Sequence, residues 1–482
     1  MSLNMTVFLY LISSVCFIQA LKGLSHPKSA RLGNVFGMIG MVIAVITTLA
    51  SLDFSELLHQ NIRGFSLLIS GLLIGSTLGA ILAKRIEMTK MPELVAVMHS
   101  FIGLSAVFIA AVAVREPQAF GIVHVAYDPI PLGNRFELFV GTFIGAITFT
   151  GSLIAFFKLS GKVKKAGVWS FLRSAPTRFS GQHQLNLVLA LVMLACGGLF
   201  FLTQNHLAFG LMLLIALALG VLLIIPIGGA DMPVIVSMLN SYSGWAAAGI
   251  GFSLNNPMLI IAGALVGSSG AILSYIMCKA MNRSFIHVLL GGLGSDASAG
   301  QEQSAEQRPV RSGSADDVAF LLSQASSVVI VPGYGLAVAR AQHAVKELAH
   351  KLSEKGILVR YAIHPVAGRM PGHMNVLLAE AEVPYESVLE MDEINSEFGD
   401  TDVVLVLGAN DVVNPAAKTD PKSPIAGMPI LEAYKARTII VNKRSMAAGY
   451  AGLDNELFYL DKTMMVFGDA KKVVEDILKA VD

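Results

Sequence analysis

The strongest constraint on this chain is a succession of long apolar runs that contain no Asp, Glu, Lys or Arg. A bilayer core takes about 20 helical residues to cross, and backbone N–H and C=O groups inside it must be paired within the protein. Nine runs are about this long, the first and sixth being the shortest: residues 5–20, 33–52, 64–83, 94–114, 138–157, 187–203, 207–227, 232–252 and 257–278. We therefore predict a multi-span α-helical membrane domain of about nine helices over residues 1–290.

The composition changes after these runs. Hydrophobic residues make up 54% and charged residues 14% of the whole chain, yet the charged residues crowd into its last third. A Gly-, Ser- and Gln-rich stretch separates the two parts, so we predict a flexible linker over residues 291–314 and a soluble domain over residues 315–482. The net charge of +1 gives no indication of a nucleic-acid partner. Three cysteines, far apart in or at the end of apolar runs, predict neither a disulfide framework nor a metal site.

Basic residues orient the predicted helices. They cluster after odd-numbered runs, at Lys22, Lys28 and Arg31; Lys84, Arg85 and Lys90; Lys158, Lys162, Lys164, Lys165, Arg173 and Arg178; and Lys279 and Arg283. By the positive-inside rule the N-terminus lies outside and the soluble domain is cytoplasmic. No basic residue precedes the first run, which favours a retained span over a cleaved signal peptide.

A few polar side chains within the runs are candidates for a proton path. His99 is the only His, Asp, Glu, Lys or Arg inside the runs as bounded above, and an imidazole titrates near neutral pH. Asn240 lies in the unusually polar eighth run and Ser152 in the fifth. These groups either line a narrow wet path or simply bond neighbouring helices together. Asp231 and Arg283, at the edges of the eighth and ninth runs, are either interfacial anchors or residues that couple helix movement to the soluble domain.

The last third alternates strand and helix patterns. Strands are predicted at residues 327–331, 357–362, 403–407, 438–442 and 464–467, with helices at 315–324 and after the first strand to about Glu354. This alternation predicts an α/β doubly wound parallel sheet of the Rossmann-like kind. The first strand opens onto Gly333 and Gly335, a partial dinucleotide fingerprint in which Val338 replaces the third glycine.

Loops after these strands carry the polar signal, and the carboxyl ends of parallel strands are where ligands bind. The second strand is not followed by the Asp or Glu that would hold the ribose of NAD, which favours NADP. Lys443, Arg444 and Ser445 suit a ribose 2′-phosphate. We find no acid–base or nucleophilic arrangement in this part of the sequence. Because hydride exchange between two nicotinamide rings needs none, the other hydride carrier is expected on a second polypeptide.

Several long stretches resemble the beta subunit of the proton-translocating NAD(P) transhydrogenases of bacterial membranes, nearly end to end. They are MPEL before His99-Ser100-Phe101, GADMPVIVSMLNSYSGW ending at Trp245, GSSGAILSYIMCKAMNR ending at Arg283, HPVAGRMPGHMN starting at His364, Gly408–Asp411, and Lys443–Ser445 with Gly449–Gly452. The resemblance implies hydride transfer from NADH to NADP coupled to inward proton movement across the inner membrane. It also implies an alpha subunit that binds NAD(H), and a dimer of alpha–beta units in membrane lipid.

The resemblance further assigns roles to residues. It implies a proton path through His99, Asn240 and Ser152. We add Asp231, Arg283 and Asp411 as coupling residues. The NADP(H) contacts expected on this chain, from the resemblance and the partial fingerprint, are Gly333, Tyr334, Gly335, Val366, Ala367, Gly368, Arg369, Met370, Pro371, Gly408, Ala409, Asn410, Asp411, Val412, Lys443, Arg444, Ser445, Met446, Ala447, Ala448, Gly449, Tyr450, Asp469 and Ala470.

Two other classes of protein fit parts of the pattern. One is a membrane-anchored NADP-dependent dehydrogenase acting on a small substrate, and the other is an ion transporter gated by an NADP-sensing domain. Nine spans with an isolated histidine are more than a membrane anchor needs. An assay of hydride exchange between NADH and an NADPH analogue, in membranes that hold this chain and its partner, would distinguish the three hypotheses.

Overall fold

The structure is a computed structural model that describes residues 3–24, 27–51, 62–125, 128–161, 177, 179–228, 231–290, 308–370, 372–421, 423, 425–446 and 453–481. The chain forms two compact units. The first comprises Met1–Ile154, Gln184–Leu222 and Leu239–Ala271, and the second comprises Ala155–His183, Leu223–Met238 and Ile272–Asp482. The second unit therefore takes in the ends of several membrane helices together with the C-terminal domain. Most of the predicted linker lies outside the described residues, so the domain boundaries stay a prediction.

The predicted membrane runs are helical. The long helices are α1 (Leu3–Leu24), α2 (Pro27–Ser51), α4 (Ile62–Arg85), α5 (Met91–Arg115), α6 (Leu132–Ser160), α7 (Gln182–Thr203), α8 (His206–Ile224), α9 (Met232–Ser253) and α10 (Pro257–Ala280). Among the described residues, eight of them are long and apolar enough to cross a membrane. The exception is α9, whose polar side chains include Asn240. The helices also extend beyond the apolar runs, so α6 contains Arg135, Glu137 and Lys158.

Glycines bring pairs of these helices into backbone contact. A Cβ at Gly103 of α5 would lie 2.5 Å from the carbonyl oxygen of Gly145 in α6. A Cβ at Gly244 of α9 would lie 2.3 Å from the backbone nitrogen of Gly267 in α10. Small residues at such positions let helices approach closely where no hydrophobic effect drives them together. The ninth apolar run, which contains Gly267, therefore packs closely against the eighth.

The C-terminal domain is a doubly wound parallel sheet, as predicted. Its strands are β1 (Ser327–Pro332), β2 (Leu358–Ile363), β3 (Val388–Glu390), β4 (Val403–Leu407), β5 (Thr438–Lys443) and β6 (Thr463–Phe467), in the order β3-β2-β1-β4-β5-β6. All pairings are parallel. β1, β4 and β5 are almost entirely buried, which explains their Val- and Ile-rich runs. The sequence pattern missed β3, a three-residue edge strand.

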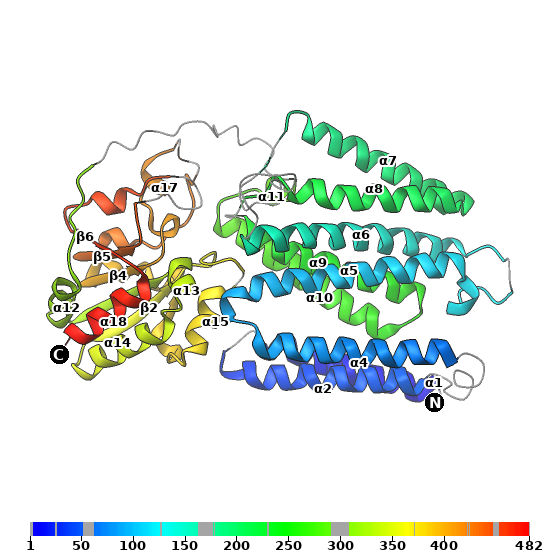
Figure 1. Ribbon diagram of the computed structural model, residues 1–482, viewed down its shortest axis with the longest axis horizontal. Helices are drawn as coiled ribbons and strands as arrows, with labels where there is room; N and C mark the ends of the chain where they lie inside the picture. The colour runs from blue at the N-terminus through cyan, green and yellow to red at the C-terminus, as the bar shows by residue number, and fades with distance from the viewer. Residues whose placement is uncertain are drawn as a thin grey trace. The chain divides into compact units, whose positions relative to one another are not determined.

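Helices flank the sheet. The longer ones are α12 (Ala315–Ser323), α14 (Gln342–Glu354), α15 (His373–Glu380) and α18 (Ala470–Ala480), and α12 and α14 pack against α18 (Figure 1). The single helix expected after β1 is in fact two. α13 (Tyr334–Ala339) ends because Arg340 adopts a left-handed backbone conformation with φ of 53°, and α14 starts two residues later.

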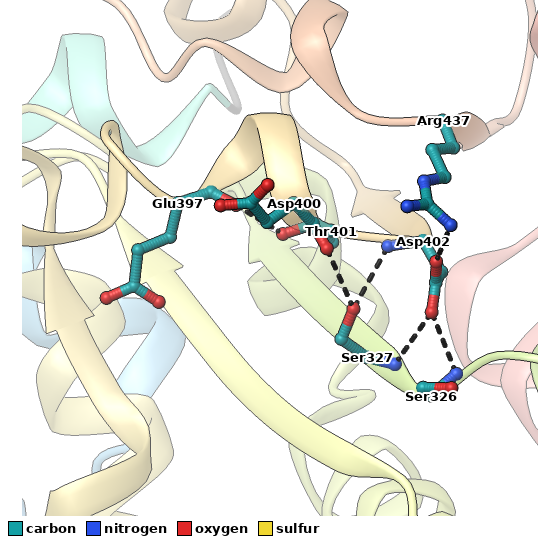
Figure 2. Close-up of polar contacts among 7 residues, drawn as sticks. All are labelled: Ser326, Ser327, Glu397, Asp400, Thr401, Asp402 and Arg437. Carbon is teal, nitrogen blue, oxygen red and sulfur yellow. Dashed lines mark hydrogen bonds and ion pairs between the residues drawn. The ribbon is translucent and has the colours of Figure 1, made fainter.

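The amino ends of three strands are tied together by one carboxylate (Figure 2). Asp402, directly before β4, accepts hydrogen bonds from the backbone N–H groups of Ser326 and Ser327 at the start of β1. It also forms an ion pair of 3.0 Å with Arg437, which precedes β5. Asp402 and its partners lie at the opposite end of the strands from the polar loops, and these bonds secure the register of the sheet.

Candidate functional site

The predicted cofactor loops leave the sheet at one edge. The strand register pairs Pro332 with Leu407, Leu407 with Asn442, and Lys443 with Phe467, so the carboxyl ends of β1, β4, β5 and β6 are level. Ligands of open α/β sheets bind at this edge, next to the point where the strand order reverses. Here the reversal lies between β1 and β4.

The glycines of the partial fingerprint serve contact between two loops. A Cβ at Gly333 would lie 2.4 Å from the carbonyl oxygen of Gly408, and one at Gly335 would lie 2.7 Å from the Cα of Gly408. Gly408 itself has a φ of 68°, a conformation that favours glycine. The loops after β1 and β4 thus touch backbone to backbone, which explains these glycines without a ligand.

The loop after β2 presents an arginine on an aromatic ring. The Arg369 guanidinium carbon lies 4.4 Å from the centre of the Tyr334 ring. The backbone N–H of Arg369 donates to Nδ1 of His373, at 3.0 Å. Burial, together with the nearby charge of Arg369, lowers the pKa of His373 to about 4. Neutral His373 therefore carries its hydrogen on Nε2, and this buried donor has no hydrogen-bond partner among the described residues.

A second neutral histidine fixes the start of the same loop. His364 Nδ1 accepts the backbone N–H of Val366 at 3.2 Å, and its Nε2 lies 2.9 Å from the carbonyl oxygen of Pro429. Burial outweighs the opposing effect of the bond to Pro429 and lowers the pKa of His364 to about 4. Both histidines hold backbone N–H groups of the cofactor loop only while they are neutral.

The loops after β4 and β5 approach one another around Lys443. Asn455 donates to the backbone and side-chain oxygens of Asn410, which anchors the loop that carries Asp411. The Lys443 ammonium lies 4.5 Å from the centre of the Phe458 ring. Burial lowers the pKa of Lys443, while the carboxylates of Asp411 and Asp454 raise it.

Arg444 is engaged differently from its neighbour Lys443. Its guanidinium pairs with Asp469 at 2.6 Å. Partial burial raises the pKa of Asp469, but the bond and charge of Arg444 outweigh this and the pKa lies below its usual value. Asp469 also accepts the backbone N–H of Lys471 at the start of α18. The two adjacent cations of the sequence thus occupy separate environments.

Most remaining candidates lie on these loops, and some lie outside the described residues. Gly368, with φ of 114°, packs on His373. Val366, Ala367 and Met370 share its loop, Ala409 and Val412 follow β4, Ser445 and Met446 follow β5, and Ala470 begins α18. Pro371, Ala447, Ala448, Gly449 and Tyr450 are outside the described residues. The loops thus carry three cations, Arg369, Lys443 and Arg444, and a buried His373 N–H that has no hydrogen-bond partner among the described residues; groups of these kinds suit an anionic dinucleotide.

In the membrane helices, His99 contacts α9. Ser243 Oγ lies 3.2 Å from His99 Nδ1 and donates its hydrogen to the carbonyl oxygen of Asn240, at 2.7 Å. A hydroxyl has one hydrogen, so Ser243 must accept from the N–H of His99 Nδ1. Neutral His99 therefore carries its hydrogen on Nδ1. Its buried Nε2 is left as a free acceptor, without a hydrogen-bond partner among the described residues.

The other membrane candidates fall into two groups. Ser152 of α6 is fully buried, and its hydroxyl has no hydrogen-bond partner among the described residues. Asp231 and Arg283, far apart in sequence, form a two-pronged ion pair with distances of 3.0 and 3.1 Å to the two carboxylate oxygens. The half-buried pair joins the start of α9 to the chain just after α10.

Two features escaped the sequence reasoning. Lys158 was used only as an orienting charge, yet it is 1% exposed and its ammonium donates to two backbone carbonyls. No role was predicted for Asn282, yet its side-chain amide donates a hydrogen bond of 3.1 Å to the carbonyl oxygen of Ala426. The sequence offered one signal for Lys158: it directly follows the fifth apolar run, so the helix can continue past the run and include the lysine in its last turn.

A bundle of apolar helices followed by a doubly wound sheet with cationic loops defines a membrane protein with a Rossmann-like domain. A sequence profile of the NAD(P) transhydrogenase beta subunit matches residues 6–480. Two curated relatives, both from Rhodospirillum rubrum, are described as NAD(P) transhydrogenase subunit beta. Each is 54% identical to this chain over 483 residues, and each alignment covers 100% of this chain and 100% of the relative. The chain belongs to the NAD(P) transhydrogenase beta subunit family, and its apolar helices make it a multi-pass membrane protein.

Proposed function

We propose that this chain couples hydride transfer from NADH to NADP with inward movement of a proton. In this proposal NADP(H) binds at the carboxyl edge of the C-terminal sheet, and NAD(H) binds to a partner alpha subunit. The observation that carries it is the contact of His99 with Ser243, one helical turn from Asn240. A buried imidazole whose Nε2 has no partner among the described residues can take up and release a proton. The same chain carries cationic loops at the carboxyl edge of its C-terminal sheet, which suit a nucleotide.

The preference for NADP is assigned to the loop after β5. Lys443 and Arg444 would pair with the ribose 2′-phosphate, with Arg444 leaving Asp469 to do so. Arg369, held on the Tyr334 ring, would meet another phosphate of the dinucleotide, and His373 Nε2 would donate to an oxygen nearby. The bound nicotinamide supplies the hydride chemistry, and the residues of this chain orient it and contribute no acid or base.

The proton path is assigned to His99, Asn240 and Ser152. A proton would be taken up and released at His99 Nε2, because Nδ1 is engaged with Ser243. Ser243 would hold the ring in this tautomer while it bridges to the Asn240 backbone. Ser152 has a hydroxyl with spare hydrogen-bonding capacity and would continue the path.

Coupling is assigned to Asp231, Arg283 and Asp411. The first two tie the start of α9 to the end of α10, so a shift of either helix reaches the C-terminal domain. Asp411 stands beside Lys443 at the nucleotide edge, where its charge would respond to an anionic ligand. One charge crossing 100 mV contributes about 2.3 kcal/mol, which raises the NADPH/NADP ratio by more than tenfold.

The proposed assembly is a dimer of alpha–beta units in the bacterial inner membrane, with the N-terminus outside and the C-terminal domain in the cytoplasm. Residues 1–290 would form the proton channel, 291–314 a flexible linker, and 315–482 the NADP(H) domain. The clustering of Lys and Arg after odd-numbered runs supports this orientation.

The decisive experiment uses sealed vesicles that contain this chain and its alpha subunit. NADPH and a spectroscopically distinct NAD analogue are added, and hydride exchange and proton uptake are followed together. Both are expected in the wild type, whereas His99→Ala should lose proton uptake and keep NADP binding. Hydride exchange without proton movement would indicate an anchored dehydrogenase, and ion flux without hydride exchange would indicate a gated transporter. Proton uptake at the wild-type ratio in His99→Ala would exclude His99 as the carrier.

A further inference from the structure

A short turn between β5 and β6 holds the loop that carries Asp411. This turn is the 3-10 helix η8 (Glu456–Tyr459), and the residue before it is Asn455. The Asn455 side chain is fully buried, and its oxygen accepts the backbone N–H of Leu457 at 2.9 Å. Its amide nitrogen donates to Asn410, at 3.0 Å to the backbone oxygen and 3.1 Å to the side-chain oxygen. One buried side chain therefore joins η8 to the start of the loop after β4.

The preceding residue, Asp454, binds the other end of that loop. Its backbone oxygen accepts a hydrogen bond of 3.0 Å from the side-chain amide of Asn414, which is also fully buried. Asn410 and Asn414 flank the 3-10 helix η6 (Asp411–Val413) on its two sides. Two neighbouring residues thus hold both ends of η6, which fixes the backbone from which its carboxylate projects.

The same segment contacts Lys443 and restrains a second carboxylate. The Phe458 ring, which is 1% exposed, has its centre 4.5 Å from the Lys443 ammonium. The Tyr459 hydroxyl donates to one side-chain oxygen of Asp454 at 2.7 Å, and the backbone N–H of Asn455 donates to the other at 2.9 Å. Both carboxylate oxygens therefore have donors within the segment, while the ammonium is stabilised by an aromatic ring.

Restraint of these carboxylates matters because Lys443 is a cation proposed to bind the ribose 2′-phosphate. Burial lowers the pKa of Lys443, and the charges of Asp411 and Asp454 are near enough to oppose that effect. A phosphate would have to displace any carboxylate that paired directly with the ammonium, and the affinity for NADP would fall. NAD has no 2′-phosphate, so its affinity would not change. Discrimination between the two nucleotides therefore depends on where the carboxylates are held.

We propose that residues 454–459 set the preference of this site for NADP by keeping the Lys443 ammonium apart from its two neighbouring carboxylates. Asn455 restrains the loop after β4, and Tyr459 restrains the carboxylate of its own segment. Phe458 stabilises the cation without neutralising it, so the charge stays available to a phosphate on the ribose O2′. These three are positioning residues, and the inference rests on the proposed binding of NADP(H) at this edge.

The test measures the affinities of NADP and NAD for the purified full-length chain in detergent, without its alpha subunit, so that both compete for one site. The ratio of the two dissociation constants is the discrimination. In Phe458→Leu it should fall at least about threefold, through weaker NADP binding alone. Phe398→Leu is the matched control, because Phe398 belongs to the same buried core but precedes β4, at the amino end of the sheet. It should keep the wild-type discrimination.

Tyr459→Phe removes a single oxygen from a half-buried side chain and leaves the ring in place. Without the hydroxyl, the Asp454 carboxylate should approach Lys443, and the discrimination should fall at least about twofold. Asp454→Asn, added to Tyr459→Phe, should restore at least the wild-type value, because an amide carries no charge. In a Lys443→Met background, Tyr459→Phe should have no further effect. A loss of packing alone would produce neither the restoration nor the dependence on Lys443.

The outcomes separate this inference from the proposed function. Wild-type discrimination in both Phe458→Leu and Tyr459→Phe overturns the inference, and so does a loss in Tyr459→Phe that Asp454→Asn does not restore. An equal loss in Phe398→Leu assigns the effect of Phe458 to packing and counts against it. Tyr459→Phe decides the matter if Phe458→Leu does not fold. Equal affinity of the wild type for NADP and NAD overturns the proposed NADP site, and the inference with it.

Discussion

Replacing Ser243 by alanine tests the proton path at one hydrogen bond. The hydroxyl is the acceptor for the Nδ1–H of His99, at 3.2 Å, and alanine leaves that buried donor without a partner. Nothing then favours the tautomer that presents a free Nε2. A neutral hydrogen bond contributes about 0.5–1.5 kcal/mol net, so the share of molecules with His99 in the competent form should fall roughly twofold to twelvefold.

Ser241→Ala is the matched control. Ser241 lies on the same helix and donates a buried hydrogen bond of 2.6 Å to the carbonyl oxygen of Gly267. In the described part of the chain, the hydrogen bond to His99 comes from Ser243 and not from Ser241. Both variants remove one buried hydroxyl from α9, so their costs in stability should be similar. Only Ser243→Ala should slow coupled turnover.

The assay follows proton uptake and hydride exchange in vesicles of the complete complex, together with NADP binding. We expect coupled turnover to fall twofold to twelvefold in Ser243→Ala and less than twofold in Ser241→Ala. NADP affinity at a fixed pH without a gradient should be unchanged in both. Equal turnover in the two variants would refute the assignment of Ser243 as the residue that sets the His99 tautomer.

Three further predictions concern the C-terminal domain. Replacing Lys443 and Arg444 together by uncharged residues should weaken NADP binding by at least about 2 kcal/mol while NAD binding changes little, since charge-assisted bonds contribute about 1.5–3 kcal/mol each. Residues 314–482 should fold and bind NADP alone, so calorimetric titration of this fragment measures both affinities. Unchanged discrimination between NADP and NAD would contradict the assignment. Asp411→Asn should alter the pH dependence of NADP(H) release more than affinity at one pH, and a parallel shift at every pH in stopped-flow release would instead mark an ordinary hydrogen bond. The same fragment should lose stability as the pH falls from about 6.5 toward 4, because burial lowers the pKa of His364 and His373 to about 4 in the fold and the unfolded chain then binds more protons. Urea unfolding should show a loss of roughly 2 kcal/mol or more between pH 7 and pH 4.5, and a flat profile would argue against two buried neutral histidines.

Local patterns in the sequence were enough for the elements and the fold class. Charge-free runs long enough to cross a bilayer must be helical, because backbone groups have no partner in lipid. Buried parallel strands need β-branched apolar residues on both faces, and β4 was predicted with its observed bounds, Val403–Leu407. The loops that carry Arg369, Asp411 and Lys443 were predicted as a set because strand order alone places their ends at one edge. These inferences rest on residues that are close in sequence, because the conformation of a helix or strand depends mainly on its own residues.

Contacts between distant residues were decided only by the tertiary structure. His99 and Ser243 are 144 positions apart, and nothing in either segment indicates the other. Lys158 has an orienting charge in the sequence, but its bonds to the carbonyl oxygens of Ile225 and Ile227 depend on where α8 ends beside it. The close approach of Gly408 to the fingerprint glycines, Gly333 and Gly335, likewise appears only in the tertiary structure. A side chain's type limits what it can bind, while the partner it binds depends on packing, which a one-dimensional pattern does not contain.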